Sequence, residues 1–249
     1  CFLHDPTGHA ALSPSLPPER INAATDNVAA LADLAAAGGA AQTAVIEAGA
    51  SARVKAVLVH HNGQNKFVRL YIQVCRLAGN LCFGGAYNFG GAYHLFGNVV
   101  VFADDATSFR WAAHAIWNAC THSEIARANL HRCRNDTGGV VEALVRGAMR
   151  FPGVPRAYGL RALAYLVLGS ERRRKSALRA NVALVLSDAT CDEPATAAAA
   201  LLCISSIVGP CGTAHLARWS GVADRADGLA NITGKLAAVA LEGGGDASA

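Results

Sequence analysis

The clearest pattern in the sequence lies in Lys66–Gly84, KFVRLYIQVCRLAGNLCFG. Its apolar residues recur at intervals of three and four, the spacing that places side chains along one face of an α-helix. A second face carries Arg69, Gln73, Arg76 and Asn80 at the same spacing, and paired glycines end the helix. An asparagine inside a helix is locally unfavourable, because its side chain competes for backbone hydrogen bonds. The presence of Asn80 therefore needs a reason.

The same pattern recurs along the chain. RLAGNLC at Arg76–Cys82 aligns with AIWNAC at Ala115–Cys120, which places Asn118 under Asn80. Weaker copies extend this column to Asp33, Asn80, Asn118, Leu166 and Ser206. The steps between these positions are 47, 38, 48 and 40 residues. Self-similarity at this period is typical of helical solenoids, so we expect a stack of helical repeats.

Each repeat is expected to contain a short, a medium and a long helix. The first such set is expected at 42–48, 50–61 and 65–83, and later sets at 123–132, 139–151 and 156–168 and at 171–179, 180–187 and 194–208. A shrunken unit lies between the first set and the later ones, with helices expected at 92–96, 98–103 and 108–121. The run NVVVFA at 98–103 fits a strand equally well, and only its neighbours favour a helix.

Composition supports closely stacked helices. Hydrophobic residues make up 52% of the 249 residues, aromatic residues only 6%, and the apolar mass is Ala, Leu and Val. We expect one repeat array over 22–242 with a degenerate unit near 86–105, an irregular or truncated edge at 1–21 and a flexible tail at 243–249. The array is expected to be a fragment of a longer one. Its core is predicted to contain Val74, Leu77, Leu81, Ile116, Leu144, Leu163, Leu166, Leu201 and Ile204.

Cysteine usage and hydropathy bear on location. Eight cysteines include no CxxC pair, and several fall in predicted core helices, where free Cys behaves as a small hydrophobe. This indicates a reducing compartment, the cytoplasm or the nucleus. Two uncharged runs, 77–103 and 194–217, are interrupted by glycine, asparagine or Gly-Pro, so no membrane span is predicted.

The basic charge forms one central block. Arg127–Arg179 holds 12 Lys or Arg against three acidic residues. Within it, Arg172–Lys175 reads first as a solvated helix turn, with a nuclear-localisation signal or a patch for an acidic partner as alternatives. Few aromatic residues are interleaved for base stacking, which argues against nucleic acid as a partner.

The motifs of common catalytic sites are missing. The chain contains no G-x-S-x-G, P-loop, G-x-G-x-x-G or His-Glu signature, and its histidines are not spaced to chelate a metal. We therefore predict no enzyme activity, no cofactor, no metal and no small-molecule substrate.

These features together resemble armadillo repeats. The resemblance is carried by the three-helix order, by EAGA at Glu47–Ala50, by GGVVEALV at Gly138–Val145 and by helices that end in an L-x-N-L-like turn, and it spans 22–241. A glycine allows the sharp angle between short and medium helices. This position holds Gly49, Gly139 and Gly221, whereas one unit departs with Ala180.

The resemblance implies that the third helices line a concave groove and that Asn80 and Asn118 bind the backbone of an extended partner peptide. Leu166 departs from this column. Importin-α-like members carry Trp one turn before the Asn, where this chain has Arg76 and His114. We therefore do not expect binding of a basic localisation peptide.

The sequence thus predicts an all-α, right-handed α-solenoid of armadillo-type repeats that acts as a protein-binding scaffold for an extended, acidic segment. Residues expected to contact the partner are Asn80, Asn118, Arg69, Gln73, Arg76, Arg110, Trp111, His114 and Arg161. One alternative is a regulator of a small GTPase, suggested by CRLAGNLC at 75–82. The other is an enzyme on a similar helical scaffold, such as a chromophore lyase.

Overall fold

The computed structural model describes residues 17–59, 67–135 and 138–208. The first helices are α1 (Pro18–Ala36), α2 (Gly39–Glu47), α3 (Ala50–Val59), α4 (Val68–Cys82), α5 (His94–Val101) and α6 (Ala106–His122). They are followed by α7 (Glu124–Arg132), α8 (Val140–Arg150), α9 (Val154–Val167), α10 (Glu171–Arg179), α11 (Val182–Ala189) and α12 (Pro194–Val208). Short elements are the 3-10 turns η2 (Phe83–Gly85) and η3 (Gly90–Tyr93) and the antiparallel pair β1 (Arg134–Asn135) and β2 (Gly138–Gly139).

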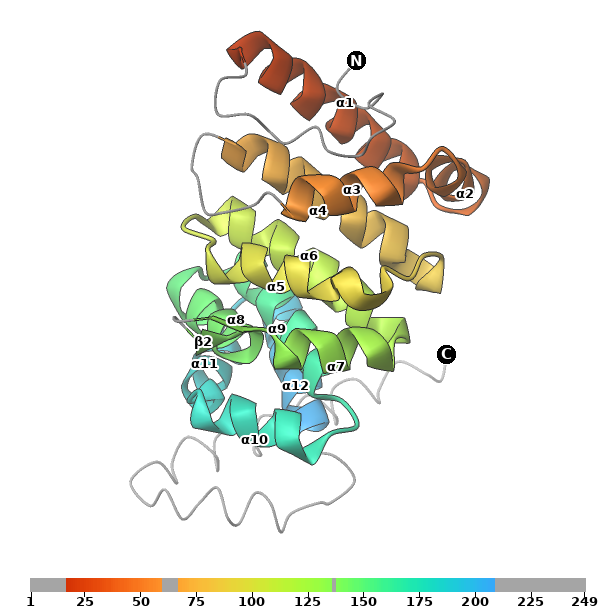
Figure 1. The fold of residues 1–249 in the computed structure, drawn as a ribbon. Helices are drawn as coiled ribbons and strands as arrows, with labels where there is room; N and C mark the ends of the chain where they lie inside the picture. Colours follow the sequence, from red (N-terminus) through yellow and green to blue (C-terminus); the bar gives the residue numbers. More distant parts are fainter. Residues whose placement is uncertain (1–16, 60–66, 136–137, 209–249) are drawn as a thin grey trace, which may run out of the picture.

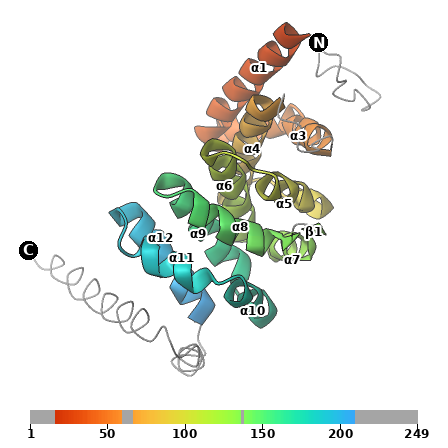
Figure 2. The ribbon, with the colours of Figure 1, turned by 90° about the vertical axis from the view of Figure 1, so that its left-hand side faces the viewer.

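The helices stack into a bent array. The long helices α1, α4, α6, α9 and α12 pack against one another in that order (Figure 1). Seen from the side, they line one face of the array, while α3, α5, α7 and α10 lie towards the other (Figure 2). The predicted all-α solenoid is therefore confirmed, and the predicted order of three helices per unit holds except in the shrunken unit. We call α1, α4, α6, α9 and α12 the third helices.

One core runs through the stack. Of the residues predicted to fill it, all are buried except Leu201, which is half-buried. The reason is the three-and-four spacing, which turns one apolar stripe of each third helix towards the helices around it. Burial of these side chains is what holds each repeat to the next.

The shrunken unit differs from its prediction. We expected two helices with a break between them, but α5 is one continuous helix and the strand alternative for 98–103 is wrong. Gly97 lies inside α5, where a Cβ atom would come within 2.6 Å of Val140 Cγ2. The glycine therefore serves close approach of α8 rather than a break.

Aromatic side chains pack together at the start of this unit. Phe89 lies 5.2 Å from Phe96 and 6.2 Å from Tyr93, measured between ring centroids. The Tyr93 hydroxyl donates to Asn88 Oδ1 at 2.9 Å and accepts from the Phe89 amide at 3.1 Å. Between α4 and α5 the described chain forms only the 3-10 turns η2 and η3, and these buried rings pack together beside α5.

The breaks between short and medium helices follow the predicted positions only in part. Gly49 has φ +78°, which favours glycine, whereas Gly139 is extended with φ −94° and precedes α8 as its N-cap. In the unit with Ala180, the left-handed residue is Asn181, with φ 60°. Asparagine tolerates this conformation, so it takes the role of the missing glycine.

The remaining predictions concern the two ends of the array. Helix α1 begins at Pro18, four residues before the predicted start of the array at residue 22. The tail at 243–249, Gly221 and the part of the predicted array beyond 208 lie outside the described residues. Within the described residues, none of the helices combines the length and the apolar character needed to span a membrane.

Candidate functional site: the third-helix face

The asparagine column joins successive third helices. Asn80 Nδ2 donates to the Ala32 carbonyl at 2.8 Å, and Asn118 Nδ2 donates to the Gly79 carbonyl at 2.9 Å. Each acceptor is the residue just before the column position of the preceding helix. The alignment of the repeats in the sequence is therefore also their alignment in the structure. This role within the chain was not predicted. Contact of either asparagine with a partner remains a prediction.

The remaining column positions act differently. Asp33 forms an ion pair with Arg76 of the next third helix. Leu166 is fully buried and adds only apolar contact. Ser206 donates to the Leu202 carbonyl of its own helix at 3.0 Å. The side-chain hydrogen bonds of the column therefore join α1 to α4 and α4 to α6, and the column positions of α9 and α12 add none between helices.

Four ring side chains meet where α6 lies beside α9. His114 lies 5.4 Å from Trp111, 6.1 Å from Trp117 and 5.6 Å from Tyr158, between ring centroids. Trp117 and Tyr158 are 5.8 Å apart. All four are half-buried. Trp117 was absent from the predicted site, although 111, 114 and 117 share the spacing of three that places side chains on one helical face.

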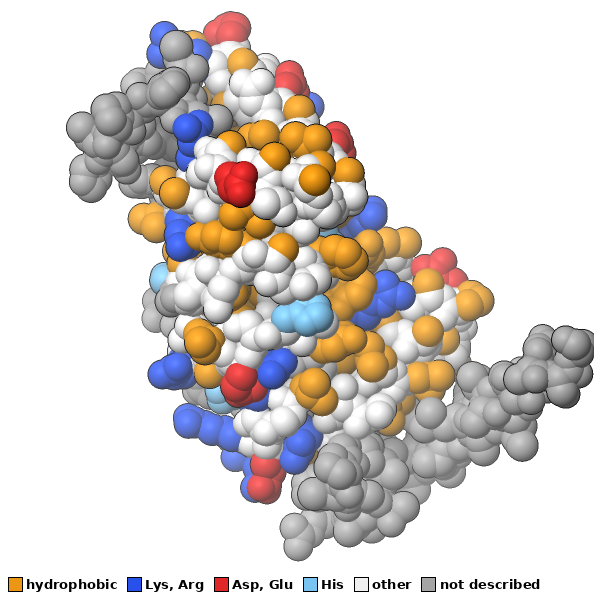
Figure 3. All heavy atoms as spheres, turned by 90° about the vertical axis from the view of Figure 1, so that its right-hand side faces the viewer, with side chains coloured by type: hydrophobic (Ala, Val, Ile, Leu, Met, Phe, Trp, Pro, Cys, Tyr) orange, Lys and Arg blue, Asp and Glu red, His pale blue; other side chains and the backbone are white. Residues whose placement is uncertain are grey.

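Guanidinium groups cover these rings. Arg110 lies over both Trp111, at 4.8 Å, and Tyr158, at 5.2 Å. Arg76 approaches Trp111 from α4 at 5.5 Å, and Arg161 lies over Trp117 at 5.1 Å. Such stacking favours guanidinium over ammonium groups. We define the arginine–aromatic cluster as Arg76, Arg110, Trp111, His114, Trp117, Tyr158 and Arg161. Figure 3 shows hydrophobic side chains interleaved with Lys or Arg near the middle of one side of the array.

The electrostatics of the cluster are dominated by cations. Asp33 neutralises Arg76, whose Nη1 also donates to Gln73 Oε1 at 3.4 Å. Arg110 and Arg161 pair with no carboxylate among the described residues. The Arg110 Nε atom is buried without a hydrogen-bond partner there. The surface therefore carries two guanidinium groups that lack an anionic partner within the described chain.

His114 is a neutral imidazole at the centre of the cluster. Burial, and then the positive charges of Arg110 and Arg76, lower its pKa from 6.5 to about 4. Its Nε2 lies 3.0 Å from Asn118 Nδ2, which can only donate, so Nε2 accepts and Nδ1 carries the proton. A Cβ atom on Gly79 would lie 2.5 Å from that Nδ1, so the glycine lets α4 approach the ring.

The structure brings most predicted site residues together. Gln73, Arg76, Arg110, Trp111, His114, Asn118 and Arg161 belong to the cluster or touch it. Asn80 lies one turn beyond Arg76 and contacts α1 instead. Arg69 is exposed, two turns before Arg76 in α4, and lies outside the cluster.

Comparison with known proteins supports the fold. No protein-family model matches the chain, and no curated protein does. Two engineered proteins solved by the Northeast Structural Genomics Consortium superpose with TM-scores of 0.63 and 0.61, at 17% and 20% identity; each match covers 79% of this chain, and 76% and 77% of the respective structures. A computationally designed armadillo repeat protein for modular peptide recognition matches with a TM-score of 0.52 at 15% identity, over 75% of this chain and 80% of that one. The chain is an α-solenoid with the fold of armadillo repeat proteins.

Proposed function

We propose that the chain is a binding scaffold whose third helices hold an extended, acidic segment of a partner protein. The observation that carries this proposal is the arginine–aromatic cluster. Its members come from α4, α6 and α9, three neighbouring helices of the same face. A partner that crosses these helices would meet aromatic surface and positive charge together.

The guanidinium groups that cover the aromatic rings indicate the charge of the partner. Arg110 and Arg161 already occupy positions over Trp111, Trp117 and Tyr158, so a partner cation would have to displace a side chain of this protein. A stacked guanidinium keeps its N–H edge available and can bind a carboxylate with two parallel hydrogen bonds. Carboxylates therefore fit this surface and ammonium groups do not.

The spacing of the helices suits an extended segment. Helices packed side by side lie about 8–10 Å apart, and an extended chain advances about 3.3 Å per residue. About three partner residues would therefore pass each third helix. The fold similarity to a protein designed for modular peptide recognition agrees with this geometry and adds support to the proposal.

The test measures binding of fluorescein-labelled peptides of about twelve residues, long enough to cross four third helices. One peptide alternates Glu with Ser and the other alternates Lys with Ser. Arg110→Gln combined with Arg161→Gln is expected to weaken binding of the Glu peptide at least tenfold, since each charged hydrogen-bonding pair contributes about 1.5–3 kcal/mol. Arg53→Gln combined with Arg132→Gln removes the same charge from α3 and α7, which lie towards the other face, and should change binding little.

Equal losses in both double variants would show that only net charge matters, and tighter binding of the Lys peptide would contradict the proposal outright. Circular dichroism and thermal melting of each variant verify that the fold is retained. A nucleotide-release assay tests the alternative function, regulation of a small GTPase.

A further inference from the structure

A second basic surface lies away from the third-helix face, where α7 and α10 run side by side. Arg173 of α10 donates two hydrogen bonds to Glu124 of α7, at 2.8 and 3.1 Å. His131 Nε2 of α7 lies 3.2 Å from Ser176 Oγ of α10. These contacts fix the two short helices to each other. We call the exposed side chains of Glu124–Arg132 and Glu171–Arg179 the α7–α10 surface.

The acidic residues of this surface are neutralised internally. The two helices carry seven Lys or Arg and two Glu. Glu124 pairs with both Arg127, at 2.7 Å, and Arg173. Glu171 pairs with Lys175 at 2.7 Å. No carboxylate therefore remains on these helices to offset the other arginines.

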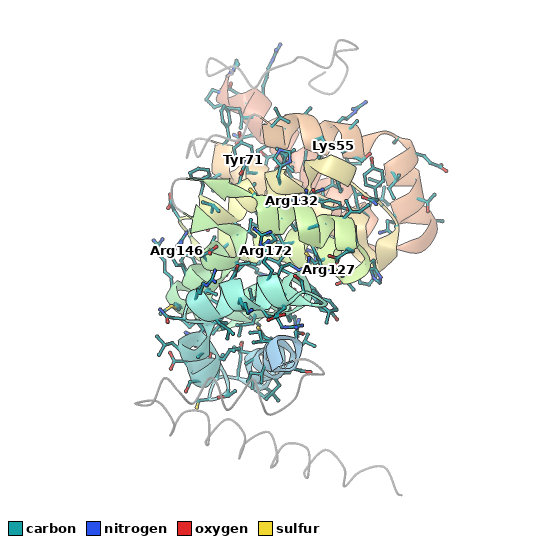
Figure 4. The ribbon with its side chains drawn as sticks, turned by 60° about the horizontal axis from the view of Figure 1, so that its bottom comes forward. Lys55, Tyr71, Arg127, Arg132, Arg146 and Arg172 are labelled. Atoms are coloured by element: carbon teal, nitrogen blue, oxygen red, sulfur yellow. The ribbon has the colours of Figure 1, made fainter. Side chains whose placement is uncertain are left out.

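Four arginines provide the excess charge. Among the described residues, no carboxylate pairs with Arg132, Arg172, Arg174 or Arg179. Arg132 bonds only within its own helix, to the Ala128 carbonyl and to Asn129 Oδ1, both at 3.2 Å. Figure 4 shows Arg132 and Arg172 near the middle of this side, with Arg127 and Arg146 to either side. The charge thus spreads over several helices.

Two of these arginines lie at positions that are electrostatically unfavourable for a cation. Arg172 and Arg174 lie in the first turn of α10, near the positive end of the helix dipole, where acidic residues are favoured. A cation at this position is repelled by the positive end of the dipole. A local rule broken without an evident structural gain is expected at functional sites.

We propose that the α7–α10 surface binds the phosphate backbone of a nucleic-acid duplex. A duplex has one negative charge per about 1.7 Å of its axis, a density that favours displacement of counterions by an arginine cluster. Arg172 and Arg179 lie about 10 Å apart along α10. The hydrogen bonds from Arg173 to Glu124 place α7, with its own arginines, beside this row. The positive charges therefore cover an area rather than a line.

The side chains between the arginines favour a duplex over other polyanions. Apart from His131, α7 and α10 contain no aromatic residue on which the bases of a single strand could stack. Ile125 is the one large hydrophobic side chain of these two helices that is exposed, whereas protein interfaces need an apolar or aromatic anchor. The scarcity of aromatics that argued against nucleic acid applies to base stacking, and backbone contacts do not need it.

The experiment is fluorescence anisotropy of a labelled duplex of about twenty base pairs, titrated with the protein over a series of salt concentrations. Arg132→Gln with Arg172→Gln is compared with Arg20→Gln with Arg53→Gln, which removes equal charge elsewhere. Two lost phosphate contacts should reduce the slope of log K against log salt by about 2 and weaken binding by at least tenfold at about 0.1 M salt. The control pair should leave the slope unchanged.

Three outcomes would overturn the proposal. These are equal losses in the two double variants, absence of saturable duplex binding at low salt, and stronger competition by a poly-Glu peptide than by unlabelled duplex at equal charge. A single strand that outcompetes the duplex would also contradict the argument from aromatic content. The Arg132/Arg172 variant must retain the helical circular dichroism spectrum and the melting temperature of the parent.

Discussion

His114 lies half-buried at the centre of the arginine–aromatic cluster. The residue stands where related groove helices are expected to carry a tryptophan, and its ring contacts Trp111, Trp117 and Tyr158. Because the neighbouring arginines and burial keep the imidazole neutral, it adds no positive charge to the cluster at neutral pH. The charge of the cluster is therefore set by its guanidinium groups alone.

This depressed pKa predicts a pH dependence of stability. The unfolded chain binds a proton at His114 below pH 6.5, whereas the folded chain does so only below about 4. The free energy of unfolding should therefore fall by about 1.4 kcal/mol per pH unit as the pH drops through this window, and no further below it. Urea unfolding of the parent and of His114→Gln at pH 7, 6 and 5 isolates the contribution. Equal slopes for the two proteins would rule it out.

At the scale of single residues, the sequence predicted which residues lie in the column better than it predicted which groups they contact. The column of Asn80 and Asn118 follows from the repeat period, which is a property of the chain alone. Their acceptors, Ala32 and Gly79, depend on how one helix is rotated against the next, and this is decided by packing. Trp117 could have been included from its spacing. Tyr158 could not, because it comes from another helix.

At the scale of elements, a ring of α6 fits between two other helices because both carry glycine. Phe109 is buried, and a Cβ atom on Gly147 of α8 would lie 2.0 Å from its Cε2 atom. A Cβ atom on Gly159 of α9 would lie 2.8 Å from its Cζ atom. The two glycines form a slot for the ring, and the slot sets how closely α8 and α9 approach α6.

Gly147→Ala is therefore expected to destabilise the protein by about 1–3 kcal/mol through overpacking, although alanine has the better helix propensity by about 1 kcal/mol. In a Phe109→Leu background the ring edge is gone, so the same change should be neutral or stabilising. A double-mutant cycle measured by urea unfolding gives the coupling. Additive effects of the two changes would contradict the slot.

Element boundaries were predictable where a cap residue marks them. Ser123 Oγ accepts from the Ala126 amide at 3.1 Å, and Ser170 Oγ accepts from the Arg173 amide at 3.4 Å, and both serines lie at or directly before a predicted helix start. The prediction failed at Gly97, where a helix-breaking residue serves close packing instead. A single sequence does not separate these two uses of glycine.

At the scale of the whole molecule, the two basic surfaces lie on different sides of the array. The arginine–aromatic cluster belongs to α4, α6 and α9, whereas the second surface belongs to α7 and α10 (Figure 2). The central basic block of the sequence is thus divided between them, with Arg161 on one side and Arg172 on the other. This division could not be predicted from charge along the chain, because it depends on which helix faces which way.

Separate surfaces should bind their ligands independently. At physiological salt the Debye length is about 8 Å, so charges on opposite sides of the array are screened from each other. We expect the dissociation constant of the Glu peptide to change by less than about twofold when the duplex is saturating, since ligands without coupling leave each other's affinity unchanged. Isothermal titration with and without duplex measures this. Mutual exclusion would mean that both ligands occupy one surface.

The end of the asparagine column at Leu166 has a mechanical consequence. A hydrogen bond is directional and holds one helix against sliding and rotation relative to the next, whereas apolar contact mainly holds their separation. Asn80 and Asn118 link α1, α4 and α6 in this way, but no side-chain hydrogen bond joins α6 to α9 within the described residues. We therefore expect the first half of the array to be the stiffer one. Changes of superhelical twist should concentrate at the joint between α6 and α9, where the aromatic rings of both helices meet.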